Sequence, residues 1–272
     1  MSRTSKSKLA RFFPILLLVL SPSGVFAQGL SAEDVMGRAH RVQFYSGNDM
    51  KARVLMRLVS KEGRERVREF MMLRKNISQG SEQRYFIYFY SPADVRDMTF
   101  MVWKHPPRDA ERWLFLPALN MVRRIAANDK RSSFVGSDFS YEDVSGREVE
   151  EDTHTFERED TLDGRPVFVV RSVPKEAKSV DFGYRLSWID KENFVLRQEQ
   201  YFDKRNEPYK TFTADEVKQV QGLWTTLKRT MKNVQSGHRT EVVFENVAYD
   251  NGIPADTFTE RSLQQAPEKW IR

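Results

Sequence analysis

Two adjacent arginines are the charged residues of the sequence that most suggest a binding role, and two carboxylates follow them a short way along the chain. Arg123 and Arg124 come after a short aromatic stretch, and Asp138 and Asp143 come next along the chain. A guanidinium group can bind a phosphate or carboxylate head group through two parallel hydrogen bonds. It can equally pair with a carboxylate of its own chain, which would tie the segment holding Asp138 and Asp143 to the preceding strand. The sequence leaves both roles open.

Histidines and one serine–lysine motif are the other groups that could do chemistry. The histidines are scattered, without the spacing of metal ligands: His40, His105, His154 and His238. Ser172 and Lys175 form a Ser-x-x-Lys pattern, but Pro174 prevents the helical turn that this motif needs. Gly-x-Ser-x-Gly, His-Glu-x-x-His and glycine-rich phosphate-loop motifs are absent from the sequence. The sequence therefore predicts neither an enzyme nor a bound cofactor or metal.

A run of acidic residues and the lack of cysteine narrow the chemistry further. The acidic run, residues 148–160, lacks the ligand spacing of a calcium loop, so it is interpreted as a solvated face. The chain contains no cysteine, which excludes thiol catalysis, cysteine-ligated metals and iron–sulfur clusters. A core without disulfides must then stabilise the fold alone.

The first 27 residues have the pattern of a secretory signal peptide. Four basic residues precede a short apolar stretch, residues 12–20, and Val25 and Ala27 supply the small residues of a cleavage site. The apolar stretch is too short to span a bilayer. We therefore expect cleavage after Ala27, export to the periplasm, and a single domain over residues 28–272.

The net charge changes once this leader is set aside. The whole chain of 272 residues has 44 Lys and Arg against 38 Asp and Glu, a formal charge of +6. Without the four basic residues of the leader, 40 remain against 38, a charge of +2. Nucleic-acid partners require a basic stripe, so a balanced surface argues against them.

The rest of the chain predicts one helix followed by a long series of strands. Ser31 is a typical N-cap, and apolar residues at helical spacing predict a helix over residues 32–45. From Met50 the apolar residues alternate with polar ones, and about eleven strands separated by tight turns follow. Such a pattern is typical of a meandering antiparallel sheet, which curls when it is this wide. The predicted fold is mainly β, a half-open antiparallel barrel.

One predicted strand, residues 84–90, is aromatic or apolar on both faces. Phe86, Tyr88 and Tyr90 alternate with Tyr85, Ile87 and Phe89. In a single-layer sheet, one of these faces has no predicted helix to cover it. That face must contact a ligand, a partner or more of the chain.

An irregular aromatic segment, residues 112–144, interrupts the series of strands. It opens with a short strand, residues 112–116, stopped by Pro117, and continues through polar sequence that contains Phe134, Phe139 and Tyr141. The inner face of a curled sheet needs a cover, and the first helix and residues 126–144 are the predicted covers. We interpret the segment as the lid of an apolar cavity.

Several motifs in this chain resemble one bacterial family. They are YFIYFYSPADV (85–95), RWLFLPA (112–118), RRI (123–125) and FVGSDFSYED (134–143). With these motifs the chain is similar to the outer membrane lipoprotein-sorting protein family, in a LolA-like branch distinct from the LolA carrier itself. The resemblance implies a LolA/LolB-like half-open barrel with a helical or loop lid over a cavity for acyl chains. It implies a periplasmic carrier of lipid or lipidated protein that contacts membranes transiently, with an RND-superfamily inner-membrane transporter as a possible partner.

Two functions are compatible with this reading. The first is a lipid or lipoprotein carrier, and the alternative is a periplasmic sensor or adaptor that binds a protein partner in response to lipid or envelope stress. The predicted ligand-binding residues are the large apolar side chains of the strands and the lid: Met56, Leu58, Phe86, Tyr88, Phe100, Trp113, Phe115, Phe134, Phe139, Tyr141 and Trp188. The predicted polar rim is Arg123, Arg124, Asp138 and Asp143.

Overall fold

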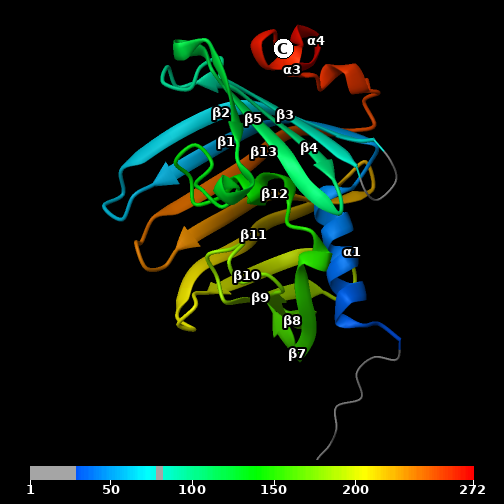
Figure 1. Ribbon diagram of the computed structural model, residues 1–272. Helices are drawn as coiled ribbons and strands as arrows, with labels where there is room; N and C mark the ends of the chain where they lie inside the picture. The colour runs from blue at the N-terminus through cyan, green and yellow to red at the C-terminus, as the bar shows by residue number, and fades with distance from the viewer. Residues whose placement is uncertain (1–28, 78–81) are drawn as a thin grey trace, which may run out of the picture. The chain divides into compact units, whose positions relative to one another are not determined.

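Strands that alternate between apolar and polar residues assemble into one antiparallel sheet. The structure, a computed structural model, describes residues 29–77 and 82–272. The described strands form a 13-stranded sheet in the order β6-β5-β4-β3-β2-β1-β13-β12-β11-β10-β9-β8-β7 (Figure 1). Their bounds are β1 Asp49–Val59, β2 Glu65–Asn76, β3 Gln83–Ser91, β4 Thr99–His105, β5 Arg108–Leu116, β6 Met121–Ile125, β7 Asp152–Leu162, β8 Arg165–Pro174, β9 Tyr184–Asp190, β10 Leu196–Phe202, β11 Pro208–Val220, β12 Leu223–Asn233 and β13 Arg239–Tyr249. The predicted mainly β, open antiparallel architecture is confirmed.

The two strands that the sequence did not predict are the two edges of the sheet. In β6, four of the five residues are exposed, so no alternation marks it as a strand. In β7 every exposed position carries a charged residue or a threonine, three of each. Edge strands are commonly rich in charge because it discourages pairing with other chains. The predicted count of about eleven strands is therefore low by these two edges.

The predicted N-terminal helix is present as α1, Ala32–Phe44. Ser31 accepts a hydrogen bond from the backbone N–H of Asp34, and the Asp34 carboxylate accepts one from the backbone N–H of Ser31. This reciprocal capping satisfies two free donors of the first turn. The buried stripe of α1 then packs toward the sheet, with Val35 fully buried.

The strand order sets how the chain covers one face of the sheet. Strands β1 to β6 run outward to one edge, and β7 to β13 return from the opposite edge until β13 pairs with β1. Between β6 and β7 the chain therefore crosses from edge to edge. We call this crossing, residues 126–151, the lid segment. It contains η2 (Ala127–Asp129), α2 (Tyr141–Ser145) and η3 (Val149–Glu151).

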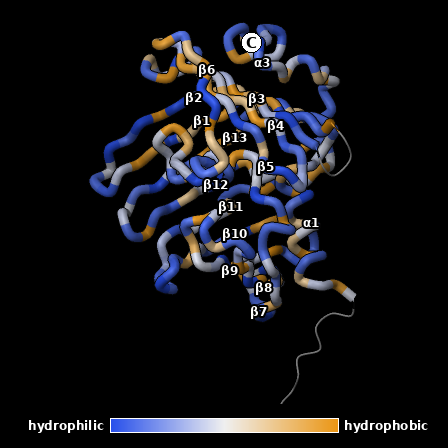
Figure 2. The backbone as a smooth tube through the Cα atoms, in the orientation of Figure 1, coloured by the Kyte–Doolittle hydropathy of each residue, from blue (hydrophilic) through white to orange (hydrophobic). Residues whose placement is uncertain are grey.

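The face that α1 and the lid segment cover, called here the inner face, carries the larger apolar core. Along β1 buried residues recur at about every second position. In Figure 2 hydrophobic and hydrophilic segments alternate along the strands of the sheet. On β3 the inward residues are Tyr85, Ile87 and Phe89, which are buried with Phe100 and with Phe134 of the lid segment. The predicted alternation of β3 is thus confirmed for this face.

The outer face of β3 is covered by more of the chain. Phe86 lies there in a second core with Ile253, Phe258, Leu263 and Ile271. These residues come from the C-terminal stretch that holds η4 (Ala255–Thr257), α3 (Glu260–Gln264) and α4 (Glu268–Ile271). In Figure 1 this stretch, orange to red, lies over the end of the sheet that contains β3 and β4. Of the three covers considered from sequence, the structure thus shows the third.

Hydrogen bonds fix the C-terminal cover in place. The Trp103 indole N–H donates to the Phe258 carbonyl at 3.0 Å, and the Thr99 hydroxyl donates to the Leu263 carbonyl at 2.7 Å. The Tyr90 hydroxyl donates to the carbonyl of Ile271. The C-terminal cover is therefore held on β3 and β4 by hydrogen bonds as well as by apolar contacts.

Membrane-spanning helices and the predicted N-terminal signal peptide remain to be considered. The predicted signal peptide, residues 1–27, lies outside the described residues. Among the helices that the structure describes, none combines the length and the apolar character needed to cross a bilayer.

The C-terminal cover gives a first prediction. Replacing Phe258, which is 2% exposed, with alanine should lower the free energy of unfolding by about 3–5 kcal/mol, because it empties a packed site. Urea unfolding followed by tryptophan fluorescence measures this. Leu119→Ala is the control, since Leu119 is 67% exposed and its loss should change stability by less than about 0.5 kcal/mol. Equal effects of the two variants would show that the cover is not part of the core.

Candidate functional site

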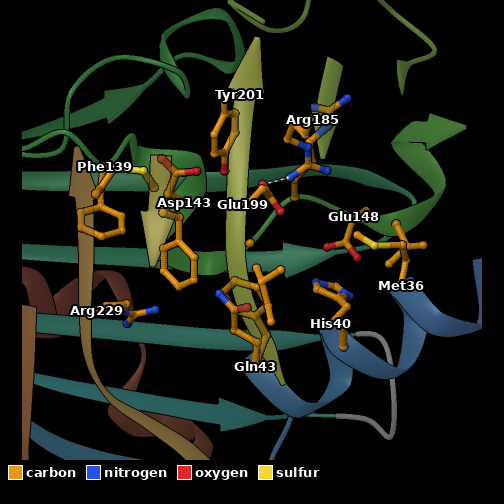
Figure 3. A pocket seen from close by; sticks show the side chains of 18 of the residues that line it. Met36, His40, Gln43, Phe139, Asp143, Glu148, Arg185, Glu199, Tyr201 and Arg229 are labelled. Carbon is orange, nitrogen blue, oxygen red and sulfur yellow. Dashed lines mark hydrogen bonds and ion pairs between the residues drawn. The ribbon is translucent and has the colours of Figure 1, made fainter. Parts of the chain in front are cut away.

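Three small cavities lie between the inner face, α1 and the lid segment. Their volumes are about 90, 60 and 40 Å³. The first is lined by Met36 and His40 of α1, Phe139 of the lid segment and Tyr201 of β10, among others (Figure 3). An engineered protein cavity that holds benzene has about 150 Å³. Each cavity is therefore too small for an acyl chain, which can be accommodated only if α1 or the lid segment moves.

Phe134 anchors the lid segment on the apolar inner face. Its ring lies 5.3 Å from that of Phe100, 6.1 Å from that of Phe89 and 5.6 Å from that of Tyr141. Only 2% of Phe134 is exposed. Aromatic contacts at these distances add to the stabilisation by burial. Phe134 thus fills apolar space on the inner face.

Polar contacts hold the lid segment at two further points. The Asp138 carboxylate accepts a hydrogen bond from Thr240 of β13 at 2.8 Å and lies 2.6 Å from Nδ1 of His238. The Asp143 carboxylate lies 3.0 Å from the Lys210 ammonium of β11 and accepts a hydrogen bond from the backbone N–H of Ser140. These bonds join the lid segment to strands of the other half of the sheet.

Both aspartates thus lie in the lid segment, and the two arginines have other partners. Arg123 lies 4.0 Å from Asp129, and Arg124 lies 2.7 Å from Glu111. Both arginines are well exposed on the edge strand β6. The pairing of Arg123 and Arg124 with Asp138 and Asp143, one of the two roles that the sequence left open, is not the one observed, because Thr240, His238 and Lys210 engage the two carboxylates.

The predicted apolar ligand-binding residues fall into three places. Six share the inner-face core: Met56, Leu58, Phe100, Phe134, Phe139 and Tyr141. Four belong to the outer core beneath the C-terminal cover: Phe86, Tyr88, Trp113 and Phe115. Trp188 packs in a separate cluster with Val167 and Val169. The last five do not face the inner cavities, because alternation along a strand sends neighbouring side chains to opposite faces.

The lid segment also contacts α1 closely. Gly146 caps α2 with a φ of +81°, and a Cβ atom there would lie 2.7 Å from the ring of Phe44. Any larger residue would both strain the backbone and push α1 away. The two covers of the inner face are therefore packed against each other at this glycine.

A network of buried charges supports one end of the first cavity. Arg185 lies 2.6 Å from the Asp152 carboxylate. It lies 2.9 Å from the Glu199 carboxylate (Figure 3). Burial lowers the pKa of Arg185, but the two carboxylates outweigh it and raise the pKa well above its usual value. Breaking one member of such a set leaves an uncompensated buried charge. The network is thus structural, and it joins β7, β9 and β10.

Two histidines, His40 and His154, line the first cavity. Burial, with Lys104 and Arg185 nearby, lowers the pKa of His40 to about 3, so its ring is neutral at physiological pH. The Nε2 atom of His154 lies 2.8 Å from the Val149 carbonyl and must donate to it, so Nδ1 accepts from the Ser172 hydroxyl. Ser172 is fully buried in this pair.

A larger polar pocket of about 540 Å³ lies between α1, the β4–β5 hairpin and the lid segment. Two of its lysines are paired with carboxylates of the chain. Lys104 lies 2.6 Å from Glu148, and Lys130 lies 3.0 Å from Glu142. Within the described residues, no group of histidines and carboxylates is arranged to hold a metal ion.

Arg229 is the residue of the cavities that the sequence interpretation missed. Among the described residues it alone lines all three inner cavities. It lies on β12 two residues from Met231, so both side chains share the inner face. An arginine at an inward position of a predicted strand was the available signal, and the long polar sequence of β12 concealed it.

Comparisons with known proteins extend this description. The model of a DUF1329-like family, described as uncharacterized protein, matches residues 81–265. A DUF1329 family protein from Desulfovibrio piger is 26% identical, with a TM-score of 0.80 over 86% of this chain and 98% of that one. No curated protein matches the sequence.

Two further solved structures share the fold. A putative outer membrane lipoprotein-sorting protein domain from Vibrio parahaemolyticus is 25% identical, with a TM-score of 0.79 over 86% of this chain and 98% of that one. A LolA superfamily protein from Nitrosomonas europaea is 16% identical, with a TM-score of 0.68 over 86% and 99% of the two chains. The similarity to the second shows the fold alone.

The Asp143–Lys210 pair gives a prediction with a defined pH dependence. Burial raises the pKa of Asp143, but Lys210 and the hydrogen bonds with Ser140 outweigh it and hold the pKa below the usual 3.8. The charged form therefore stabilises the fold above about pH 3.8, and this contribution is lost as the pH falls further. We expect Asp143→Asn to cost about 1.5–3 kcal/mol at pH 7 and clearly less near pH 3.

Chemical unfolding at both pH values measures the difference between the variant and the wild type. Asp256→Asn, which alters an exposed carboxylate, is the control and should match the wild type within about 0.5 kcal/mol. A cost of Asp143→Asn that stays constant between pH 7 and pH 3 would contradict the assignment.

Proposed function

The chain belongs to the DUF1329-like family, and from this membership and its lidded apolar interior we propose that it carries acyl chains between membranes. In this proposal the chains occupy the inner face after the lid segment moves aside. The observation that carries the proposal is the continuous apolar core between sheet and lid segment, which contains small cavities in the closed form.

The free energy of transferring acyl chains into water favours a carrier protein of this kind. Each methylene group removed from water contributes about 0.8 kcal/mol. Transfer of a palmitoyl chain into water therefore costs on the order of 10 kcal/mol of free energy. Because of this cost, the chain needs a protein to cross an aqueous space. Phe134 and Phe139 occupy the apolar surface of the sheet when no ligand is bound. An entering chain would replace their contacts, so the net cost of opening stays small.

The way in which the lid segment is attached supports movement. It is tethered covalently to β6 at one edge and to β7 at the other, and between them it is held by Phe134 and by the polar contacts of Asp138 and Asp143. Near β7 the lid segment is held as well by Lys104 with Glu148 and by the packing of Gly146 against Phe44. None of these contacts is part of the strand pairing, so they can break without disturbing the sheet. A membrane or receptor that binds the displaced lid segment would then release the cargo.

The proposal also includes the location of the protein and its partners. We place the protein in the periplasm, on the basis of the predicted signal peptide, with lipid or lipidated protein as cargo and transient membrane contact. An RND-superfamily transporter is the proposed partner at the inner membrane. This part rests on the family resemblance. The pairing of His154 with a fully buried serine supports a carrier without a catalytic step.

Locking the lid segment tests the proposal. The chain has no cysteine, so Asp138→Cys with Thr240→Cys introduces a single disulfide between the lid segment and β13, where the native side chains are hydrogen-bonded. A fluorescent fatty acid that brightens in apolar surroundings reports uptake. We expect the oxidised variant to lose uptake and the same protein, after reduction with dithiothreitol, to regain it.

The single variant Asp138→Cys is the matched control, because it loses the same carboxylate but forms no crosslink. It should take up the fatty acid under both redox conditions. Full uptake by the oxidised double variant, with the disulfide verified by mass spectrometry, would show that ligand does not enter beneath the lid segment.

A further inference from the structure

We propose that Arg229 binds the anionic group of the cargo inside the cavity, so that the carrier selects amphiphiles whose carboxylate or phosphate lies next to an acyl chain. This inference rests on the proposed function and narrows it. An acylated protein N-terminus carries ester and amide groups, which are neutral. An anionic lipid is therefore the favoured cargo.

The position of Arg229 places its charge in the centre of the apolar interior. On the sheet its neighbours across the strands are Ala214 of β11 and Val242 of β13. Its guanidinium lies 4.3 Å from the ring centre of Phe244 and 6.0 Å from that of Phe139. Figure 3 shows Arg229 below Phe139, directed into the cavity.

The guanidinium of Arg229 has neither a hydrogen-bond nor an ion-pair partner among the described residues, apart from these two rings. Burial lowers the pKa of Arg229 to about 10, so the group remains charged at neutral pH. A buried charge without a partner is unfavourable by several kcal/mol. An anion that enters with the cargo would remove this cost.

The neighbouring buried cations differ from Arg229 because each has an oxygen partner within the chain. Arg74, which also lines one of the cavities, donates to the Phe44 carbonyl at 2.6 Å. Arg185 is paired with Asp152 and Glu199, and Lys104 is paired with Glu148. The carboxylate nearest in its electrostatic effect on Arg229 is that of Asp143, which Lys210 and Ser140 already engage. Among the described residues that line the three cavities, Arg229 is thus a cation whose guanidinium no oxygen of the chain engages.

The surroundings of Arg229 favour an amphiphile over a free anion. Val54, Met72, Val144 and Phe244 line the adjoining cavity and offer no hydrogen-bond donor for the remaining oxygens of a free phosphate. They do offer apolar contact to a chain attached to the anion. A bidentate contact with the guanidinium would then fix the head of the cargo while its chain replaces the lid's aromatic side chains.

Competition against a neutral fluorescent reporter, N-phenyl-1-naphthylamine, tests the inference. Palmitate and 1-palmitoyl-glycerol-3-phosphate supply the two anionic heads, and hexadecanol supplies the same chain without charge. We expect the wild type to bind the anions about 10- to 100-fold more tightly than hexadecanol, as a charge-assisted hydrogen bond implies. In Arg229→Gln this preference should disappear while the affinity for hexadecanol is retained.

Lys228→Gln is the matched control. Lys228 is the preceding residue of β12, carries the same charge, and is exposed on the other face in contact with Glu216. It should keep the full preference for anions. Urea unfolding of both variants verifies that they fold, and Arg229→Lys, which keeps the charge without the planar fork, should retain part of the preference.

The outcomes separate this inference from the proposed function. If Arg229→Gln binds palmitate as tightly as the wild type, the inference is wrong and the carrier function stands. If the wild type binds neither palmitate nor hexadecanol, the proposed function itself fails. Inorganic phosphate alone is tested as a competitor in the same way. If it displaces the reporter from the wild type but not from Arg229→Gln, the site binds free anions and the proposed selection of amphiphiles is wrong.

Discussion

The strand order obliges the chain to travel from one edge of the sheet to the other between β6 and β7. Because each half of the sheet is a simple antiparallel meander, the crossing has one stretch of chain to accomplish it, residues 126–151. That stretch passes over an apolar face that must be kept from water. The connection is therefore also the cover, and the cover is held by side chains rather than by pairing within the sheet. This dual role explains why aromatic residues occur in a segment without strand alternation.

The sequence predicted those features that depend on local patterns. The capped helix α1, the strands with clear alternation and the two-faced β3 were all expected, because N-cap chemistry and period two are visible along the chain. The edge strands β6 and β7 were missed because solvent on their outer side removes the alternation. Trp113 and Phe115 were assigned to the cavity, but the C-terminal residues that cover them are more than a hundred positions away in sequence. No local pattern carries that information.

The polar residues illustrate the same limit. Asp138 and Asp143 were expected in the lid and lie there, yet their partners, Thr240 and Lys210, come from β13 and β11. Arg123 and Arg124 drew attention because they are adjacent, while Arg229 was overlooked in a strand rich in lysine and threonine. The structure distinguishes them by burial: the first two are exposed at an edge, and Arg229 lines the interior. A charge gains functional meaning here from the absence of a partner, which only the three-dimensional arrangement reveals.

The central claim is that the inner face exchanges the aromatic side chains of the lid segment for an acyl chain. Native mass spectrometry of the full chain, purified from the periplasm without detergent, measures this most directly. We expect a population heavier than the polypeptide by the mass of a lipid, which organic extraction removes and identifies. A single species at the mass of the polypeptide, together with no uptake of added fatty acid, would contradict the account.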